Sequence, residues 1–310
     1  MIKKLHLILL MIACLPAGLY AQVSGSFNVQ GDYSKFYPVT FYDGGFWSHF
    51  PTELNLGRSY VHADGDWHGS MIANIRFHVT AWGHGSRFID VNQHQFNPNN
   101  QNGVFIAAWD DISGDNPTER IVVWLRGATT YNYRANVNVL PVVYDGVQNA
   151  LPLTVPNSVI APITFKTAPE IYVNANGITN ESTAYFRGEG LNFINGSLGI
   201  GTFKTNGHKL AVEGTIGARK IKVDQQTWAD YVFADDYKLP SIPEIERFIR
   251  EHKHLPEIPS AEEVAENGLD VGEMNKKLLQ KVEELTLYLI EQNKRMDAME
   301  GELKDLRERR

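Results

Sequence analysis

The last forty residues of the chain place apolar side chains at alternating spacings of four and three, the repeat of a left-handed coiled coil. This pattern defines two seam positions, a and d, over about five heptads, and no Pro interrupts it. Position a holds Asn275, Val282, Leu289, Met296 and Leu303, and position d holds Val271, Leu278, Leu285, Gln292, Met299 and Leu306. The sequence therefore predicts a coiled coil over residues 270–310.

The residues of this seam favour three chains rather than two. Leu289 and Leu303 stand at position a, where dimers prefer β-branched residues, and Gln292 can pair around a three-fold axis. Arg295/Glu300 and Glu302/Arg307 have the spacing of ion pairs between neighbouring helices. The alternative is one amphipathic helix packed on its own domain, for which a stripe of two residues in seven is narrow.

Residues 1–21 read as a secretory signal peptide. Lys3 and Lys4 precede an apolar run that ends at Pro16, and Ala21 closes an acceptable cleavage site. A retained membrane helix is less favoured because the run is short, and a lipoprotein anchored at Cys14 is less favoured because the preceding residues make a poor lipobox. We expect an exported protein, extracellular or at the cell surface, without membrane insertion after signal removal.

Composition narrows the classes of partner and of chemistry. Cys14 is the only cysteine, so the exported chain would contain no disulfide and no thiolate site. The net charge is −7, and the loss of Lys3 and Lys4 would make it about −9. An acidic surface argues against nucleic acid as a partner.

Residues 22–190 have the pattern of a β-rich domain. Short runs of aromatic and β-branched residues alternate with turns rich in Gly, Asn, Asp and Pro. The expected strands are 36–42, 71–81, 88–94, 104–109, 120–124, 129–134 and 137–144. This many short strands predict a β-sandwich or jelly roll that serves as a head domain.

The remainder before the coiled coil contains a glycine-containing β-shaft, residues 191–223, and a small helical region, residues 224–269. The shaft carries "LGIGT" from Leu198 and "KLAVEGTI" from Lys209. In the helical region, residues 243–251 are expected to form a helix, and Ser260 with Glu263 forms a capping box for a second helix that ends at Gly268.

These motifs, with "WADYVF" from Trp228, "DDYKLPSIPEIERFI" from Asp235 and "HKHLPEIPSAEEV" from His252, carry a resemblance. The C-terminal part resembles that of Bacteroidetes-type secreted tail-fibre-like proteins and, more distantly, the intramolecular chaperone domain of endosialidase-type phage tail spikes. The resemblance implies three chains wrapped around one axis and a chaperone-like region that drives their assembly. It implies self-cleavage at a Ser-Asp motif, but here Ala229 precedes Asp230, and alanine offers no nucleophile.

Tryptophan and histidine in the β-domain are the candidate ligand-binding residues. Trp47, Trp67 and Trp82 stand among Gly, His and Asp in expected loops, next to or near His68 and His84. Flat aromatic faces beside hydrogen-bonding side chains suit a sugar-binding surface. The alternative is that these residues close the ends of the sandwich, while Trp109 and Trp124 belong to the core.

Catalytic, metal and cofactor sites are not expected. The six histidines of the β-domain lack a strong metal-ligand spacing, and the carboxylate pairs Asp64/Asp66 and Asp110/Asp111 stand in turns. We therefore expect a non-enzymatic, exported homotrimeric fibre-type protein. A carbohydrate-binding adhesin, with a surface glycan as partner, is the alternative, and a glycan hydrolase is the less favoured third reading.

Overall fold

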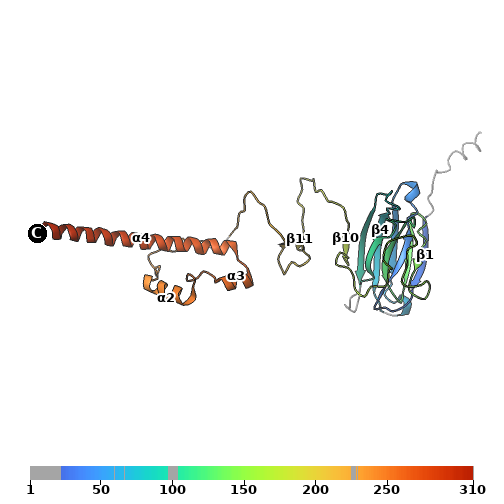
Figure 1. Ribbon diagram of the computed structural model, residues 1–310, viewed down its shortest axis with the longest axis horizontal. Helices are drawn as coiled ribbons and strands as arrows, with labels where there is room; N and C mark the ends of the chain where they lie inside the picture. The colour runs from blue at the N-terminus through green and yellow to red at the C-terminus, as the bar shows by residue number, and fades with distance from the viewer. Residues whose placement is uncertain are drawn as a thin grey trace, which may run out of the picture. The chain divides into compact units, whose positions relative to one another are not determined.

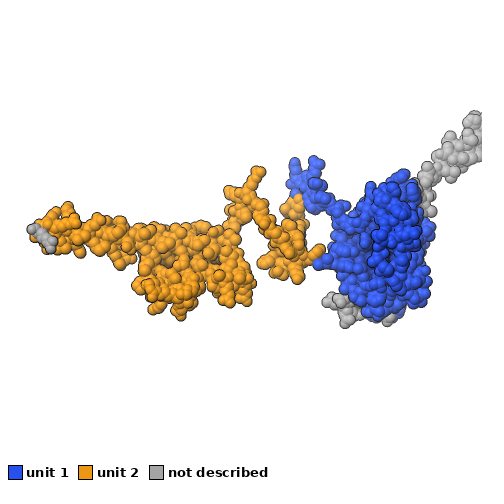
Figure 2. Space-filling view, in the orientation of Figure 1, with its two compact units in different colours: residues 1–190 blue, residues 191–310 orange. Residues whose placement is uncertain are grey.

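The computed structural model describes residues 22–58, 60–65, 67–96, 104–224, 228 and 230–309. The expected signal peptide, Asp66 and Ala229 lie outside these residues. The chain divides into two compact units, residues 1–190 and residues 191–310 (Figure 2). The first unit consists mainly of antiparallel β-sheet, and the second ends in a long helix (Figure 1).

A six-stranded antiparallel sheet forms the larger part of the first unit. Its order is β1 (Val23–Val29), β8 (Thr129–Ala135), β3 (Thr52–Arg58), β4 (Ser70–His78), β5 (Phe88–Phe96) and β10 (Gly177–Thr179). Along β4 the side chains of Met71, Ala73, Ile75 and Phe77 are buried, and those between them are exposed. Such alternation is the pattern of a sheet with one face on the core and one face in water.

A four-stranded antiparallel sheet has the order β6 (Ile106–Asp111), β7 (Arg120–Arg126), β2 (Phe36–Tyr42) and β9 (Val142–Val143). Its strands β2 and β7 are buried almost without interruption because both of their faces are covered. Val39 and Phe41 share one core cluster with Leu54 and Ile75 of the larger sheet. On the other face, Phe36, Val122 and Trp124 pack with Leu153, Val155 and Ile163 from the following loop.

The strand predictions were right in outline and wrong at four places. Trp109 and Trp124 are core residues, as expected. Strand β1 was missed because Ser, Gly and Asn dilute its apolar signal, β3 because two of its buried residues, Thr52 and Arg58, are polar, and β10 because it has only three residues. The expected strand 137–144 was wrong, since only Val142–Val143 pairs with β2. Leu140 has a φ of 39° and is followed by Pro141, which has no N–H to donate, so the chain cannot pair through this point.

The second unit begins with two three-residue strands, β11 (Leu198–Ile200) and β12 (Leu210–Val212), which pair in parallel. Three helices follow, α2 (Ile242–His252), α3 (Ala261–Asn267) and α4 (Val271–Glu308). The predicted capping box of α3 is confirmed, because the Ser260 side chain accepts from the Glu263 N–H and Glu263 accepts from the Ser260 N–H. Within the described residues, no helix combines the length and the hydropathy needed to cross a membrane.

Arg58 is a buried cation that ties β3 to the neighbouring turn. Its side chain is 1% exposed and donates to the carbonyl oxygens of Gly69 and Ala63 and to Asp64 Oδ2, the last at 2.5 Å. Burial acts to raise the pKa of Asp64, but hydrogen bonds from Thr130 and the charge of Arg58 outweigh it, so the pKa lies below 3.8. The Asp64 contribution to stability is therefore present above pH 3.8 and is lost as the pH falls through the lowered value.

Replacing Asp64→Ala leaves the buried Arg58 charge without its anion. We expect a loss of about 3 kcal/mol in the free energy of unfolding at neutral pH. Urea unfolding of residues 22–310, followed by tryptophan fluorescence, measures this loss. The control is Asp90→Ala, which removes a solvent-exposed pair with Arg76 at 3.5 Å and is expected to cost less than about 1 kcal/mol. Equal losses for the two variants, or a difference that persists in strong acid, would contradict the structural role of Asp64.

Candidate functional site

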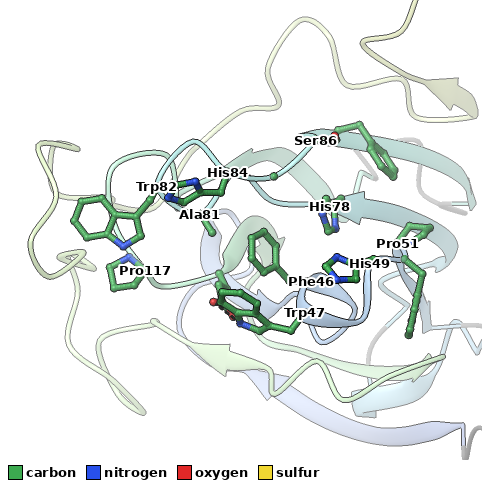
Figure 3. A pocket seen from close by; sticks show the side chains of 14 residues that line it. Phe46, Trp47, His49, Pro51, His78, Ala81, Trp82, His84, Ser86 and Pro117 are labelled. Atoms are coloured by element: carbon green, nitrogen blue, oxygen red, sulfur yellow. Dashed lines mark hydrogen bonds between the residues drawn. The ribbon is translucent and has the colours of Figure 1, made fainter.

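One pocket in the first unit is bordered by three parts of the chain. It has a volume of about 900 Å³ and is lined by residues of the segments 46–51, 78–88 and 117–119. In Figure 3, Trp82 and Pro117 lie at one end, His49 and Pro51 lie toward the other, and Phe46 lies between them. The segment 46–51 includes the short helix η1 (Phe46–Ser48).

Trp47 presents its indole to this pocket without being buried. The side chain is 72% exposed, and its Nε1–H donates to Glu119 Oε1 at 2.9 Å. The other Glu119 oxygen accepts from the Tyr42 hydroxyl at 3.0 Å. Phe46 meets the indole edge-on, with ring centroids 5.1 Å apart. A hydrogen-bonded carboxylate and one aromatic contact therefore hold a solvent-facing ring in place.

Trp82 is held by an unusual backbone. Ala81, Trp82 and Gly83 have successive φ values of 38°, 59° and 77°, a left-handed conformation that costs L-residues about 1–2 kcal/mol each. Ser113 fixes it, because its Oγ accepts from the Ala81 N–H at 2.9 Å and its carbonyl oxygen accepts from the Trp82 N–H at 3.1 Å. The Trp82 side chain is 54% exposed. Ala81 is buried in the core and anchors the turn, but the strain at Trp82 gains that ring little burial, which points to a functional reason for placing the ring there.

Backbone strain is concentrated around this pocket. Among the described residues, eleven other than glycine have a positive φ, and four of these line the pocket: His49, Ala81, Trp82 and Glu119. Strained residues of this kind persist only where the surrounding structure holds them, and they gather at binding and catalytic sites. At this pocket, therefore, several residues adopt backbone conformations that cost stability and fix the geometry of the site.

A buried carboxylate orients the third aromatic group of the pocket. Asp43 is fully buried and accepts from the Thr52 hydroxyl at 2.6 Å and from the Val79 N–H at 3.1 Å. His78 Nδ1 lies 3.0 Å from Asp43 Oδ2, and its ring stacks on Phe46 with centroids 5.2 Å apart. The stacking on Phe46 and the nearby carboxylate place the His78 ring at the pocket.

The predicted ligand-binding residues fall into two groups. Trp47, Trp82 and His84 line the same pocket. Trp67 and His68 do not: Trp67 lies against His62 with centroids 4.4 Å apart, and His68 stacks on Tyr33 at 3.9 Å.

The pocket residues that sequence reasoning missed include Phe46, His49, His78 and Glu119. One signal could have found His49, because Trp47-Ser48-His49 and Trp82-Gly83-His84 share the same Trp-x-His spacing. His78 and Glu119 are brought to the pocket only by the pairing of strands, which a single sequence does not reveal.

The described carboxylates that had been considered for hydrolysis take part in local structure. Asp64 contacts Arg58. Asp111 accepts from the Thr80 N–H at 2.7 Å and from the Ser113 hydroxyl at 2.6 Å, while Asp110 contacts Arg87 at 3.2 Å. Within the described part of the chain, no group of three or more His, Cys, Asp or Glu side chains is arranged to hold a metal ion.

The helix α4 carries the second candidate site on one of its faces. The apolar seam residues are 45–69% exposed, although they form the most hydrophobic stripe of the helix. They are Leu278, Val282, Leu285, Leu289, Met296, Met299, Leu303 and Leu306, and the seam residue Gln292 is also exposed. In the described residues, the seam is thus open to solvent along its length.

The opposite face of α4 is covered by its own chain in the first half of the helix, while residues 291–309 are exposed. Gln280 and Glu284, at heptad positions f and c, are buried. The Tyr231 hydroxyl donates to Gln280 Oε1 at 2.6 Å, and the Tyr237 hydroxyl donates to Glu284 Oε1 at 2.5 Å. Lys281 bridges Glu257 and Glu284 at 2.8 and 3.0 Å. We call this network the polar clamp; it attaches the segments around Tyr231, Tyr237 and Glu257 to the helix without using the seam.

Comparison of the chain with protein-family models, with curated proteins and with solved structures found no match. The resemblance of the C-terminal part to tail-fibre-like proteins therefore stays an expectation. What supports a function is the geometry of the pocket and of α4.

Removing the central side chain of the polar clamp tests how the second unit holds together. Gln280→Ala removes hydrogen bonds to Tyr231, Glu257 and the buried Glu284, and a buried polar group that loses its partner costs about 1–3 kcal/mol. We expect residues 231–240 to lose protection in hydrogen exchange while α4 keeps its own. Lys294→Ala is the matched control, because Lys294 is exposed at the same heptad position two heptads later. Unchanged protection of residues 231–240 in Gln280→Ala would show that the clamp does not hold them.

Proposed function

We propose that the protein is an exported homotrimeric fibre-type surface protein whose C-terminal region assembles three chains and presents the β-domain. The observation that carries this proposal is the division of α4 into two faces. One face binds the protein's own chain through the polar clamp, while the apolar seam is left exposed. Apolar side chains repeated every three and four residues gain burial when they meet the same seam on another helix.

The chain upstream supports the same conclusion. Between residues 185 and 223 the large apolar side chains are exposed, among them Phe186 at 79% and Leu191 at 88%. The strands β11 and β12 have only three residues each, and a two-stranded pair is marginal by itself in water. Three copies wrapped around one axis would bury these side chains and extend the pair into a larger sheet. Residues 191–223 of this segment form our proposed shaft.

Three chains fit the seam better than two. Leu289 and Leu303 at position a weaken the preference for a dimer, and Gln292 can hydrogen-bond to its copies around a three-fold axis. Arg295 contacts Glu291 within the same helix at 2.5 Å, a surface pair that contributes little. In the proposed trimer, Arg295 also has the heptad spacing to form an ion pair with Glu300 of a neighbouring chain.

We infer that the two sheets of the head domain face each other as a β-sandwich of jelly-roll type. The support is the shared core cluster, in which Val39 and Phe41 of the smaller sheet lie with Leu54 and Ile75 of the larger. About 165 residues with such a core are enough to fold alone. The head is therefore expected to keep its fold whether or not the chains assemble. Since Ala229 cannot act as a nucleophile for self-cleavage, we expect the C-terminal region to stay attached to the head domain.

Charges placed in the seam test the proposal directly. The double substitution Leu285→Asp/Leu289→Asp puts two carboxylates per chain into the interior of the bundle, where each unpaired charge costs several kcal/mol. We expect the trimer to be lost and a soluble monomer with a folded β-domain to remain. Sedimentation velocity reports the association state, and tryptophan fluorescence reports the β-domain.

The matched control is Ile290→Asp/Lys294→Asp, which adds the same number of carboxylates to the same helix. Ile290 and Lys294 are exposed at positions b and f, outside the seam. This control is expected to stay trimeric. A trimer that survives the seam substitution, or one that is lost equally in the control, would show that the seam does not assemble the protein.

A further inference from the structure

We propose that the pocket of the first unit binds an uncharged glycan, with Trp47 and Trp82 as stacking platforms. This inference goes beyond assembly, because every residue that lines the pocket belongs to the first unit and none belongs to the seam. The site could therefore exist in a monomer, and the seam could work without it.

The chemistry of the lining matches a sugar ring. One face of a pyranose presents C–H groups that carry a small positive charge, and these pack against the electron-rich face of an indole. The ring's hydroxyl groups need donors and acceptors at the edge of the contact. Trp47 and Trp82 offer exposed faces, and His49, His78 and His84 supply imidazole nitrogens around the same hollow. A volume of about 900 Å³ lies within the usual range for small-ligand sites, about 300–1,000 Å³.

The charge of the lining selects an uncharged sugar over an acidic one. Among the described residues that line the pocket there is no Lys or Arg, and Glu119 is the one carboxylate. Sites for acidic sugars or phosphate use cationic donors, Arg above all. Here an acidic group would enter a pocket whose formal charge is negative, so a neutral hexose or N-acetylhexosamine is the ligand that fits.

The platforms are held in place before a ligand arrives. Glu119 fixes the Trp47 indole through its Nε1–H, and Ser113 fixes the left-handed backbone of Trp82. Asp43 and Phe46 orient the His78 ring. Ordering exposed side chains on binding weakens affinity, and a prearranged site avoids much of that loss. This explains physically why hydrogen bonds and a strained backbone hold Trp47 and Trp82, although these exposed rings add little to the core.

The test uses the mature full chain on an array of neutral and acidic oligosaccharides, followed by calorimetry with the neutral sugar that binds best. We expect binding to uncharged glycans, weakened at least about tenfold in Trp82→Ala and in Trp47→Ala, which corresponds to about 1.4 kcal/mol. Trp67→Ala is the matched control, because Trp67 is another exposed tryptophan of the same unit and lies outside the pocket. It is expected to bind as the unaltered protein does.

Further measurements separate a lost site from a lost fold. Trp82→Ala should unfold at the same temperature as Trp67→Ala, since both side chains are more than half exposed. Glu119→Gln should weaken binding less than Trp47→Ala, because the amide oxygen can still accept from the indole. The proposal is overturned if no uncharged glycan binds, if acidic glycans bind better, or if Trp67→Ala weakens binding as much as Trp82→Ala. None of these outcomes depends on the association state, which sedimentation reports separately.

Discussion

The exposed apolar seam of α4 is the constraint on which the proposed assembly depends. Eight large apolar side chains are exposed along this face, and covering them would bury apolar surface and stabilise this part of the chain. The polar clamp uses hydrogen bonds and ion pairs on the other face of the same helix. Polar groups of this kind position the clamped segments but provide little hydrophobic stabilisation, which the proposed association would add.

In the first unit, the core residues and the residues of the pocket loops have different roles. Its core is apolar and shared by two sheets, and its loops carry the polar and strained groups. Asp43 shows the connection between them: it is fully buried at the end of β2, where it fixes the Thr52 hydroxyl, the Val79 N–H and His78. One buried carboxylate therefore joins the stability of the sheets to the orientation of a pocket side chain. The pocket can be rigid because its supports are in the core.

Particular residues show how far the sequence reaches. The heptad pattern predicted α4 almost to its ends, and Ser260 with Glu263 predicted the start of α3, because both signals are local. Strand β3 was missed although Leu54 and Leu56 alternate with polar residues, since Thr52 and Arg58 are buried polar side chains that no pattern distinguishes from exposed ones. The residues of the candidate site were likewise predictable only in part. Trp47 and Trp82 were found by composition, but only strand pairing separates them from Trp67 and adds His78 and Glu119.

The most direct measurement of the central claim is the molar mass of the mature chain, residues 22–310, by size-exclusion chromatography with multi-angle light scattering. The account predicts three times the mass of one chain, unchanged over a wide range of protein concentration, because the seam and the proposed shaft are buried together. A mass of one chain would mean that the exposed seam has no partner of its own kind. A mass of two chains would contradict the three-fold arrangement inferred from Leu289, Gln292 and Leu303.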